Sequence, residues 1–151
     1  MKPKYLNIKN NIAHIRDINL IDVAREYKTP LYVFDQYELE DNMKLFVDNF
    51  KSSNFNCHTV YASKAFLVPA MCELLVKHGL WMDAVSLGDL YVAYKSGFPM
   101  NHIIFHGNNK SKAELEFAVE HDCVIVVDHL EELVLLNSIC ETNHKNISTM
   151  F

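Results

Sequence analysis

The chain has 151 residues, of which half are hydrophobic and 22% are charged, and its formal net charge is −5. This composition supplies enough apolar side chains for one ordinary hydrophobic core and argues against an intrinsically disordered chain. No basic cluster interrupts the acidic balance. The sequence therefore offers no electrostatic footprint for nucleic acid, and we expect no nucleic-acid partner.

The apolar runs and the cysteines bear on where the protein resides. The longest apolar stretches, such as Cys123–Val127, fall far short of the roughly 20 residues of a membrane-spanning helix. No apolar signal-peptide core follows Met1. The four cysteines never form a CxxC pair, which is typical of free thiols in a reducing compartment. We therefore expect a cytoplasmic protein without a membrane contact.

Five apolar runs have the length of strands buried on both faces. In chain order they are Leu31–Phe34, Cys57–Ala62, Met82–Val85, His102–Phe105 and Cys123–Val127. Each run is followed by a segment in which apolar residues recur three and four positions apart. This spacing predicts helices over residues 39–50, 66–78, 87–96, 112–121 and 129–141. Such alternation with short loops predicts parallel strands joined by right-handed crossovers.

Four of the junctions between these elements share a helix-start pattern, in which Asp or Ser is followed three positions later by an acidic residue. The first side chain can accept a backbone N–H of the first helical turn, and the acid complements the positive end of the helix dipole. The pairs are Asp35 with Glu38, Ser86 with Asp89, Ser111 with Glu114, and Asp128 with Glu131. Their intervals support the predicted alternation.

The remaining junction contains Lys64. In Tyr61-Ala62-Ser63-Lys64-Ala65 the serine is followed three positions later by Phe66 instead of an acid, so the helix-start pattern fails there. A local rule that fails often marks a functional site. A lysine held among apolar groups loses hydration of its charged form, and its neutral amine can attack a carbonyl group. We predict Lys64 as the catalytic residue, although the spacing alone also suits a solvated lysine at a strand end.

A series of motifs between Tyr27 and Cys140 resembles the fold-type III pyridoxal-phosphate-dependent decarboxylases. In chain order these motifs are Thr29-Pro30-Leu31-Tyr32-Val33-Phe34-Asp35, Tyr61-Ala62-Ser63-Lys64-Ala65, Asp83-Ala84-Val85-Ser86, Gly97-Phe98-Pro99, Ile104-Phe105-His106-Gly107-Asn108-Asn109-Lys110-Ser111, and Ile125-Val126-Val127-Asp128 with Glu131-Glu132-Leu133. The first two motifs resemble the whole superfamily, which includes ornithine and arginine decarboxylases. The run from His106 to Ser111 is similar to the diaminopimelate branch.

The resemblance implies an α/β fold, namely the N-terminal portion of a pyridoxal-phosphate-binding (β/α)8 TIM-like barrel of the alanine racemase kind, truncated after about four βα units. Residues 1–35 are then expected to pack with a C-terminal β-domain that is absent from this chain, and residues 36–151 to form the partial barrel. Ile147–Phe151 is expected in the fifth barrel strand. Because half a barrel exposes the inner faces of its strands and a free edge, we predict that the 151-residue chain alone is inactive or poorly soluble.

The same resemblance implies the chemistry. Lys64 is expected to hold pyridoxal 5′-phosphate covalently, and the cofactor ring takes up electrons as CO2 leaves an amino-acid substrate. In the diaminopimelate branch the substrate is meso-2,6-diaminopimelate and the product is L-lysine. Asp83 and Ser86 are expected to orient Lys64 and the cofactor, and His106 to be a wall or a hydrogen-bonding group of the same site. The full-length form is expected to be a homodimer.

Departures from the family pattern leave alternatives open. Phe66, Leu87 and Asp89 differ from the residues that are commoner in the family at these positions. The substrate is therefore also compatible with ornithine or arginine, and the barrel with a non-catalytic pyridoxal-binding role. For the three predicted cofactor contacts other than the lysine, a helix cap or a satisfied loop residue is an equally simple interpretation.

Two further interpretations come from spacing. A complete doubly wound domain of the flavodoxin kind, with five parallel strands, fits the length, although the chain has neither a GxGxxG nor a Walker lysine motif. His102 and His106 lie four residues apart on one strand face and could in principle bridge a metal. No third ligand has matching spacing nearby, so we predict no metal site.

Overall fold

The computed structural model describes residues 4–151 and divides into two units, one up to Phe46 and one from Val47 to Phe151. The division falls inside helix α2 (Gln36–Asn49) and not between residues 35 and 36. That residues 1–35 pack with a further domain stays a prediction. Within the described residues, no helix is both long enough and apolar enough to cross a membrane.

The first unit contains a small antiparallel sheet. Its strands, in order across the sheet, are β1 (Leu6–Lys9), β2 (Ile12–Ile15) and β3 (Ile18–Asn19). Asn10 and Asn11 form the turn between β1 and β2 with φ of 50° and 60°, a left-handed conformation that asparagine tolerates. Helix α1 (Leu20–Tyr27) follows the sheet. The sequence patterns predict neither the sheet nor α1, because strands of two to four residues carry too short an alternation.

The predicted strand Leu31–Phe34 is wrong. This segment is irregular, its side chains are exposed, and in the described part of the chain it pairs with no strand. An apolar run predicts burial but does not identify the partner that would supply it. The helix start that follows is confirmed, because Asp35 Oδ1 accepts the N–H groups of Tyr37 at 2.9 Å and of Glu38 at 3.4 Å.

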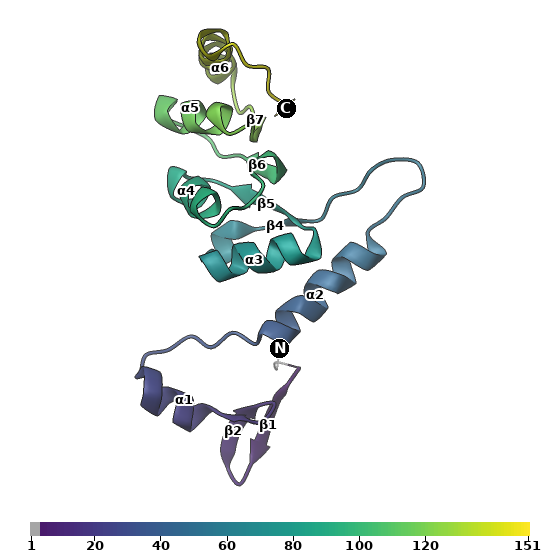
Figure 1. Ribbon diagram of the computed structural model, residues 1–151, viewed down its shortest axis with the longest axis vertical. Coiled ribbons are helices and arrows are strands. Elements are labelled where there is room, and N and C mark those ends of the chain that lie inside the picture. The colour runs from purple at the N-terminus through teal and green to yellow at the C-terminus, as the bar shows by residue number, and fades with distance from the viewer. Residues whose placement is uncertain (1–3) are drawn as a thin grey trace. The chain divides into compact units, whose positions relative to one another are not determined.

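The second unit is a five-stranded parallel sheet with helices between the strands (Figure 1). The strands are β4 (Val60–Tyr61), β5 (Trp81–Ala84), β6 (Ile103–Phe105), β7 (Val124–Val126) and β8 (Thr149–Met150). The helices are α3 (Pro69–His78), α4 (Leu87–Lys95), α5 (Lys112–Glu120) and α6 (Leu130–Asn143). The strands and helices predicted for this part of the chain are confirmed, mostly with shorter bounds.

The order of strands distinguishes the two predicted architectures. The strands lie in chain order, β4-β5-β6-β7-β8, and each neighbouring pair is parallel. Right-handed crossovers that always step in one direction place the connecting helices on one face of the sheet, as in a (β/α)8 barrel. A doubly wound sheet reverses direction at a switch point and has helices on both faces. The doubly wound alternative is therefore wrong, and the sheet has the order of a barrel portion.

The two faces of the sheet differ in burial. Met82 and Ala84 of β5, and Ile103 and Phe105 of β6, are fully buried on the face that the helices cover. Asp83, which lies between Met82 and Ala84, is only half-buried. Alternation along a strand sends neighbouring side chains to opposite faces. The half-buried face therefore corresponds to the inside of a barrel.

Two more of the predicted helix starts are confirmed. Ser86 caps α4 through the N–H of Asp89, and Ser111 with Glu114 forms a reciprocal capping box at α5. Helix α3 begins after Val68 without a side-chain cap, which agrees with the failed pattern at that junction.

The predicted start of α6 is wrong by one residue. His129, not Asp128, is the N-cap, and its Nδ1 accepts the N–H of Glu132 at 3.2 Å. The chain is still extended at His129, with φ of −154° and ψ of 166°. Because an imidazole nitrogen can also accept a hydrogen bond, the pattern based on Asp128 and Glu131 selected the wrong pair.

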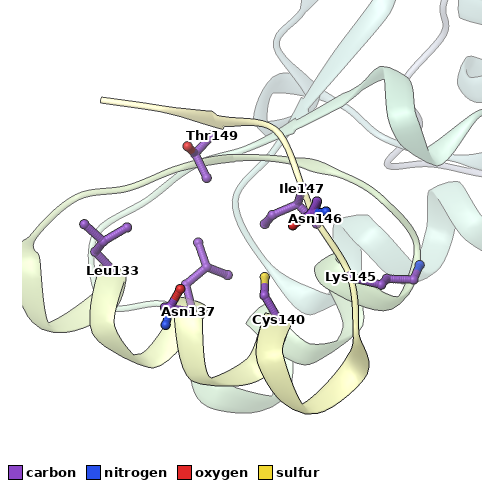
Figure 2. A pocket seen from close by; sticks show the side chains of 8 residues that line it. Leu133, Asn137, Cys140, Lys145, Asn146, Ile147 and Thr149 are labelled. Carbon is purple, nitrogen blue, oxygen red and sulfur yellow. The ribbon is translucent and has the colours of Figure 1, made fainter.

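A groove of about 190 Å³ lies between α6 and the segment that leads into β8. Figure 2 shows the side chains that line it, among them Leu133, Asn137, Cys140, Ile147 and Thr149. Thr149 is in register with Ile125, whose side chain is fully buried. The groove therefore lies on the helix-covered side of the sheet, whereas the candidate site is on the other face.

Candidate active site

Lys64 lies three residues after the end of β4, in a 3₁₀ turn at Ser63–Ala65. The hydroxyl of Tyr61 spans this turn and donates a hydrogen bond to the carbonyl of Phe66 at 2.8 Å. Burial, and then the negative charge of Asp83, raise the pKa of Tyr61, which keeps its hydroxyl a donor. The side chain of Lys64 is exposed, so the described residues do not form the apolar surroundings that the sequence argument assumed.

Asp83 connects the turn that carries Lys64 to the next strand. Its Oδ1 accepts the N–H of Ser63 at 2.6 Å, and its Oδ2 lies 3.0 Å from Nε2 of His106. The side chain of Asp83 is 16% exposed and that of His106 is 32% exposed. A carboxylate only accepts hydrogen bonds, so this contact with an ionised Asp83 requires Nε2 of His106 as the donor. The structure thus brings Asp83 and His106 together and joins both to the turn of Lys64.

The hydroxyl of Ser63 is buried and has no hydrogen-bond partner among the described residues. The whole residue is only 2% exposed. A buried hydroxyl without a partner is costly and is usually satisfied by a ligand or an ordered water. This open hydrogen-bonding position is one residue away from the amine of Lys64.

Ser86 is engaged at the start of α4. Its Oγ accepts the N–H of Asp89 at 3.2 Å and donates to Oδ2 of Asp89 at 2.9 Å. The first N–H of this helix, on Leu87, donates to Oε1 of Glu114 at 3.1 Å. Carboxylates therefore hold the first turn of α4, and a contact between Ser86 and a cofactor stays a prediction.

Glu114 links the starts of two helices. Besides the N–H of Leu87, it binds the N–H of Ser111 at 2.8 Å and the Ser111 hydroxyl at 2.7 Å. Burial acts to raise the pKa of Glu114, but these hydrogen bonds and the charge of Lys110 outweigh it, so the pKa lies below its usual 4.5. Glu114 is therefore ionised at neutral pH and fixes the loop that follows β6 against α4.

The loop after β6 lines a cavity of about 310 Å³. The lining residues are Val85, His106, Gly107, Asn108, Asn109, Lys110 and Glu114. Gly107 has φ of 115° and Asn109 has φ of 85°, so the chain passes twice through conformations that other residues rarely adopt. The run from His106 to Ser111, which resembles the diaminopimelate branch, is thus a sharply turning loop.

A buried ion pair on this loop was not predictable from the sequence patterns. Nζ of Lys110 lies 2.8 Å from Oε1 of Glu132 on α6 and donates to the carbonyl of Gly107 at 2.7 Å. The two charged side chains are each only 2% exposed. Lys110 stands in a quoted motif, but nothing local distinguishes Glu132 from its acidic neighbour Glu131. A buried lysine requires an acid, and the sequence does not say which one.

His102 and His106 have different partners. The His102 ring stacks on Trp81 with centroids 4.9 Å apart and an interplanar angle of 8°, whereas His106 contacts Asp83. Across residues 4–151, no group of three or more His, Cys, Asp or Glu side chains is arranged to hold a metal.

Comparison with known proteins identifies the family. Residues 37–149 match the family described as "Pyridoxal-dependent decarboxylase, pyridoxal binding domain". The chain belongs to this family. The resemblance found in the motifs is confirmed, and so is the pyridoxal cofactor that it implied.

The family members most useful for comparison are diaminopimelate decarboxylases. The one from Bacillus methanolicus is 45% identical over 136 residues, which is 89% of this chain and 31% of that protein. The one from Bacillus subtilis (strain 168) is 44% identical over 140 residues, which is 90% of this chain and 32% of that protein. The chain spans about a third of the length of these relatives.

Solved structures agree with the fold. The crystal structure of the M. jannaschii diaminopimelate decarboxylase in co-complex with L-lysine superimposes with a TM-score of 0.90 at 30% identity. The match covers 97% of this chain and 35% of that one. The barrel portion predicted from the sequence is therefore confirmed.

The described residues fit the pyridoxal cofactor of the family. The amine of Lys64 is accessible at the carboxyl edge of the parallel sheet, which is where barrel enzymes hold their reactive groups. The buried hydroxyl of Ser63, the preceding residue in the chain, has no partner among the described residues. Which residues contact the cofactor stays a prediction, with Lys64, Asp83 and His106 now placed at one edge.

Proposed function

We propose that this chain is the first part of a pyridoxal-phosphate-dependent decarboxylase in which Lys64 carries the cofactor. One observation carries the proposal. An accessible amine ends the first strand of the barrel portion, beside the contact between Asp83 and His106, in a chain whose family is pyridoxal-dependent. A family of this kind needs an amine to attach the cofactor.

The proposed roles follow from the hydrogen bonds. When bound, pyridoxal phosphate accepts the electrons of the bond to the departing carboxyl group. Lys64 supplies the attaching amine and moves protons at Nζ. Asp83 fixes the turn of Lys64 by accepting the N–H of Ser63, and it keeps the proton of His106 on Nε2.

We propose diaminopimelate as the substrate. The relatives that match most of this chain are named diaminopimelate decarboxylases, and one solved relative is in complex with L-lysine. Release of one carboxyl group of meso-2,6-diaminopimelate as CO2, with a proton taking its place on the same carbon, gives L-lysine, so the reaction suits lysine biosynthesis. We further propose that the full-length protein is a cytoplasmic homodimer.

The lysine assignment is tested in a full-length protein, by which we mean this chain continued to the length of its relatives. Lys64→Ala is expected to abolish both CO2 release from diaminopimelate and the visible absorption of the attached cofactor, which borohydride removes in the unaltered protein. Lys112→Ala is the matched control, because Lys112 is an exposed lysine on α5 of the same unit. Covalent cofactor retained in Lys64→Ala would overturn the assignment.

The substrate assignment is tested separately with diaminopimelate, ornithine and arginine. The proposal expects kcat/KM to be highest for diaminopimelate. A higher kcat/KM for ornithine or arginine would overturn the proposed substrate but retain the proposal that the protein is a decarboxylase. Attached cofactor without CO2 release from any of the three would indicate the non-catalytic pyridoxal-binding alternative.

A further inference from the structure

The pair of Lys110 and Glu132 is unusual among the ion pairs of the described residues, because both charged groups are removed from water. Their side chains are each 2% exposed. By contrast, Lys112 and Glu116 on α5 form an exposed pair at 3.5 Å with side chains 67% and 50% exposed. Removing two charges from water is costly, and apolar residues of similar size often stabilise a core equally well. Stability alone is therefore a weak reason for this pair.

The geometry of the pair specifies one loop conformation. Nζ of Lys110 bridges Oε1 of Glu132 at 2.8 Å and the carbonyl of Gly107 at 2.7 Å. The second oxygen of Glu132, Oε2, is buried and has no partner among residues 4–151. Glu132 therefore depends on Lys110 for compensation of its charge. The ammonium in turn attaches the loop after β6 to α6 at Gly107, the residue that follows His106.

A continuous series of contacts leads from this pair to Lys64. Gly107 is bonded to His106, whose ring contacts Asp83 at 3.0 Å. The other oxygen of Asp83 binds the N–H of Ser63 at 2.6 Å, and Ser63 precedes Lys64. The backbone N–H of His106 also binds the carbonyl of Ala84 at 2.9 Å. Gly107 is thus the position through which the pair is joined to His106.

We propose that Lys110 and Glu132 are positioning residues that hold the loop after β6 so that His106 meets Asp83 in the orientation that the site requires. This proposal rests on the proposed function for its effect on turnover. The proposed role requires no contact of Lys110 or Glu132 with the cofactor or the substrate. Misplacement of a site group by a fraction of an ångström to one ångström is enough to slow a reaction on the order of tenfold or more.

The test separates positioning from stability by three variants of the full-length protein. Lys110→Met leaves Glu132 buried without its partner, and this variant is expected to be destabilised. Lys110→Met with Glu132→Leu replaces the pair by apolar side chains, which restores stability but not the anchor on Gly107. Lys112→Met with Glu116→Leu makes the same change at the exposed pair on α5 and is the matched control.

Two readouts use the protein without cofactor. Hydrogen exchange of a peptide covering residues 105–111 is expected to be on the order of tenfold faster in the apolar double variant than in the unaltered protein. ¹⁵N signals of the His106 ring are expected to show the proton on Nε2 in the unaltered protein and a mixture of both tautomers in the variant. The control variant is expected to match the unaltered protein in both measurements.

The third readout is turnover. In the apolar double variant, kcat is expected to fall on the order of tenfold while KM stays within about twofold, because a positioning group acts on the chemical step. Unaltered loop exchange and an unaltered His106 tautomer in a folded double variant would overturn the proposal. A double variant that fails to fold would make the pair a stability element and would overturn it as well.

Failure of the proposed function looks different. If the full-length protein releases no CO2 from any of the three amino acids, the catalytic proposal fails. The exchange and tautomer measurements on the cofactor-free protein still decide whether Lys110 and Glu132 position His106.

Discussion

The same three strands, β4, β5 and β6, end very differently at their two edges. At the carboxyl edge, Asp83 binds the N–H of Ser63 and the ring of His106. At the amino edge, Trp81 is stacked between His58 at 4.3 Å and His102 at 4.9 Å, measured between ring centroids.

Trp81 and Asp83 are two residues apart on β5 and point to the same, half-buried face of the sheet. One edge is therefore built from stacked rings and the other from directional hydrogen bonds. Stacked rings tolerate small shifts, whereas hydrogen bonds fix positions and protons. This face of the sheet therefore packs at one edge and places chemical groups at the other.

Apart from loss of Lys64 itself, the largest expected effect comes from changing the carboxyl edge at Asp83. In Asp83→Asn the amide oxygen can still accept the N–H of Ser63, but the amide NH2 then faces Nε2 of His106. The ring must move its proton to Nδ1 or lose the contact. We expect kcat/KM of the full-length protein to fall on the order of 100-fold, with ¹⁵N signals showing the changed tautomer.

Asp122→Asn is the matched control for this prediction. Asp122 also forms an ion pair, with Lys145 at 2.9 Å, but it lies in an exposed turn before β7. We expect its kcat/KM to stay within about twofold of the unaltered protein, because surface pairs contribute little. Equal kcat/KM values for Asp83→Asn and Asp122→Asn would show that the carboxyl edge at Asp83 has no special role in the chemistry.

The amino edge is expected to affect stability more than chemistry. Trp81→Ala removes the central ring of the stack, and we expect local opening of β4, β5 and β6 to become easier by roughly 2 kcal/mol, less than for a fully buried tryptophan. Hydrogen exchange of the strand amides measures this. Trp81→Phe keeps a ring and is expected to lose less. If Trp81→Ala left hydrogen exchange of the strand amides unchanged but lost the attached cofactor, Trp81 would act on the chemical site. That result would contradict the assignment of a packing role to the amino edge.

A smaller effect is expected where a polar residue only caps a helix. Ser111→Ala removes a reciprocal capping box at α5 and is expected to cost about 1 kcal/mol of helix stability, with kcat unchanged within about twofold. Hydrogen exchange of the first turn of α5 reports the loss. A large fall in kcat with normal exchange would show that Ser111 belongs to the site.

The smallest effect concerns pH. Glu114 has a lowered pKa in the folded chain, so its contribution to stability is present above its unfolded pKa, which is near the usual 4.5, and is lost as the pH falls through the folded pKa. We expect the thermal midpoint of the full-length protein to fall on acidification below about 4.5. Glu114→Gln is expected to weaken this dependence. An unchanged slope would mean that other carboxylates account for it.

Much of the barrel portion is predictable because its signals are local. Strand and helix alternation, the caps at Ser86 and Ser111, and the uncapped junction beside Lys64 each depend on residues a few positions apart. The carboxyl ends of parallel strands then meet at one edge without further information. The grouping of Lys64, Asp83 and His106 comes from the family resemblance, which implies that they lie at the ends of successive barrel strands.

The wrong predictions, and the ion pair that the sequence patterns did not predict, depend mostly on contacts between residues far apart in the chain. Leu31–Phe34 has the composition of a strand but pairs with no strand in the described chain, and α6 is capped by a histidine that the pattern did not include. The pair of Lys110 and Glu132 joins residues 22 positions apart. Tertiary packing decides the first and the third, and periodicity does not record it. The cap of α6 is local, but the helix-start pattern considered only Asp and Ser as capping residues.

The attachment of the cofactor to Lys64 is tested most directly by mass spectrometry of the full-length protein after borohydride reduction in the presence of pyridoxal phosphate. Digestion yields a peptide that contains Tyr61-Ala62-Ser63-Lys64-Ala65. We predict that the reduced pyridoxal phosphate mass is carried by Lys64 and by no other lysine in stoichiometric amount. Stoichiometric modification of a different lysine, or none at all in a protein that releases CO2 from diaminopimelate, would contradict the assignment.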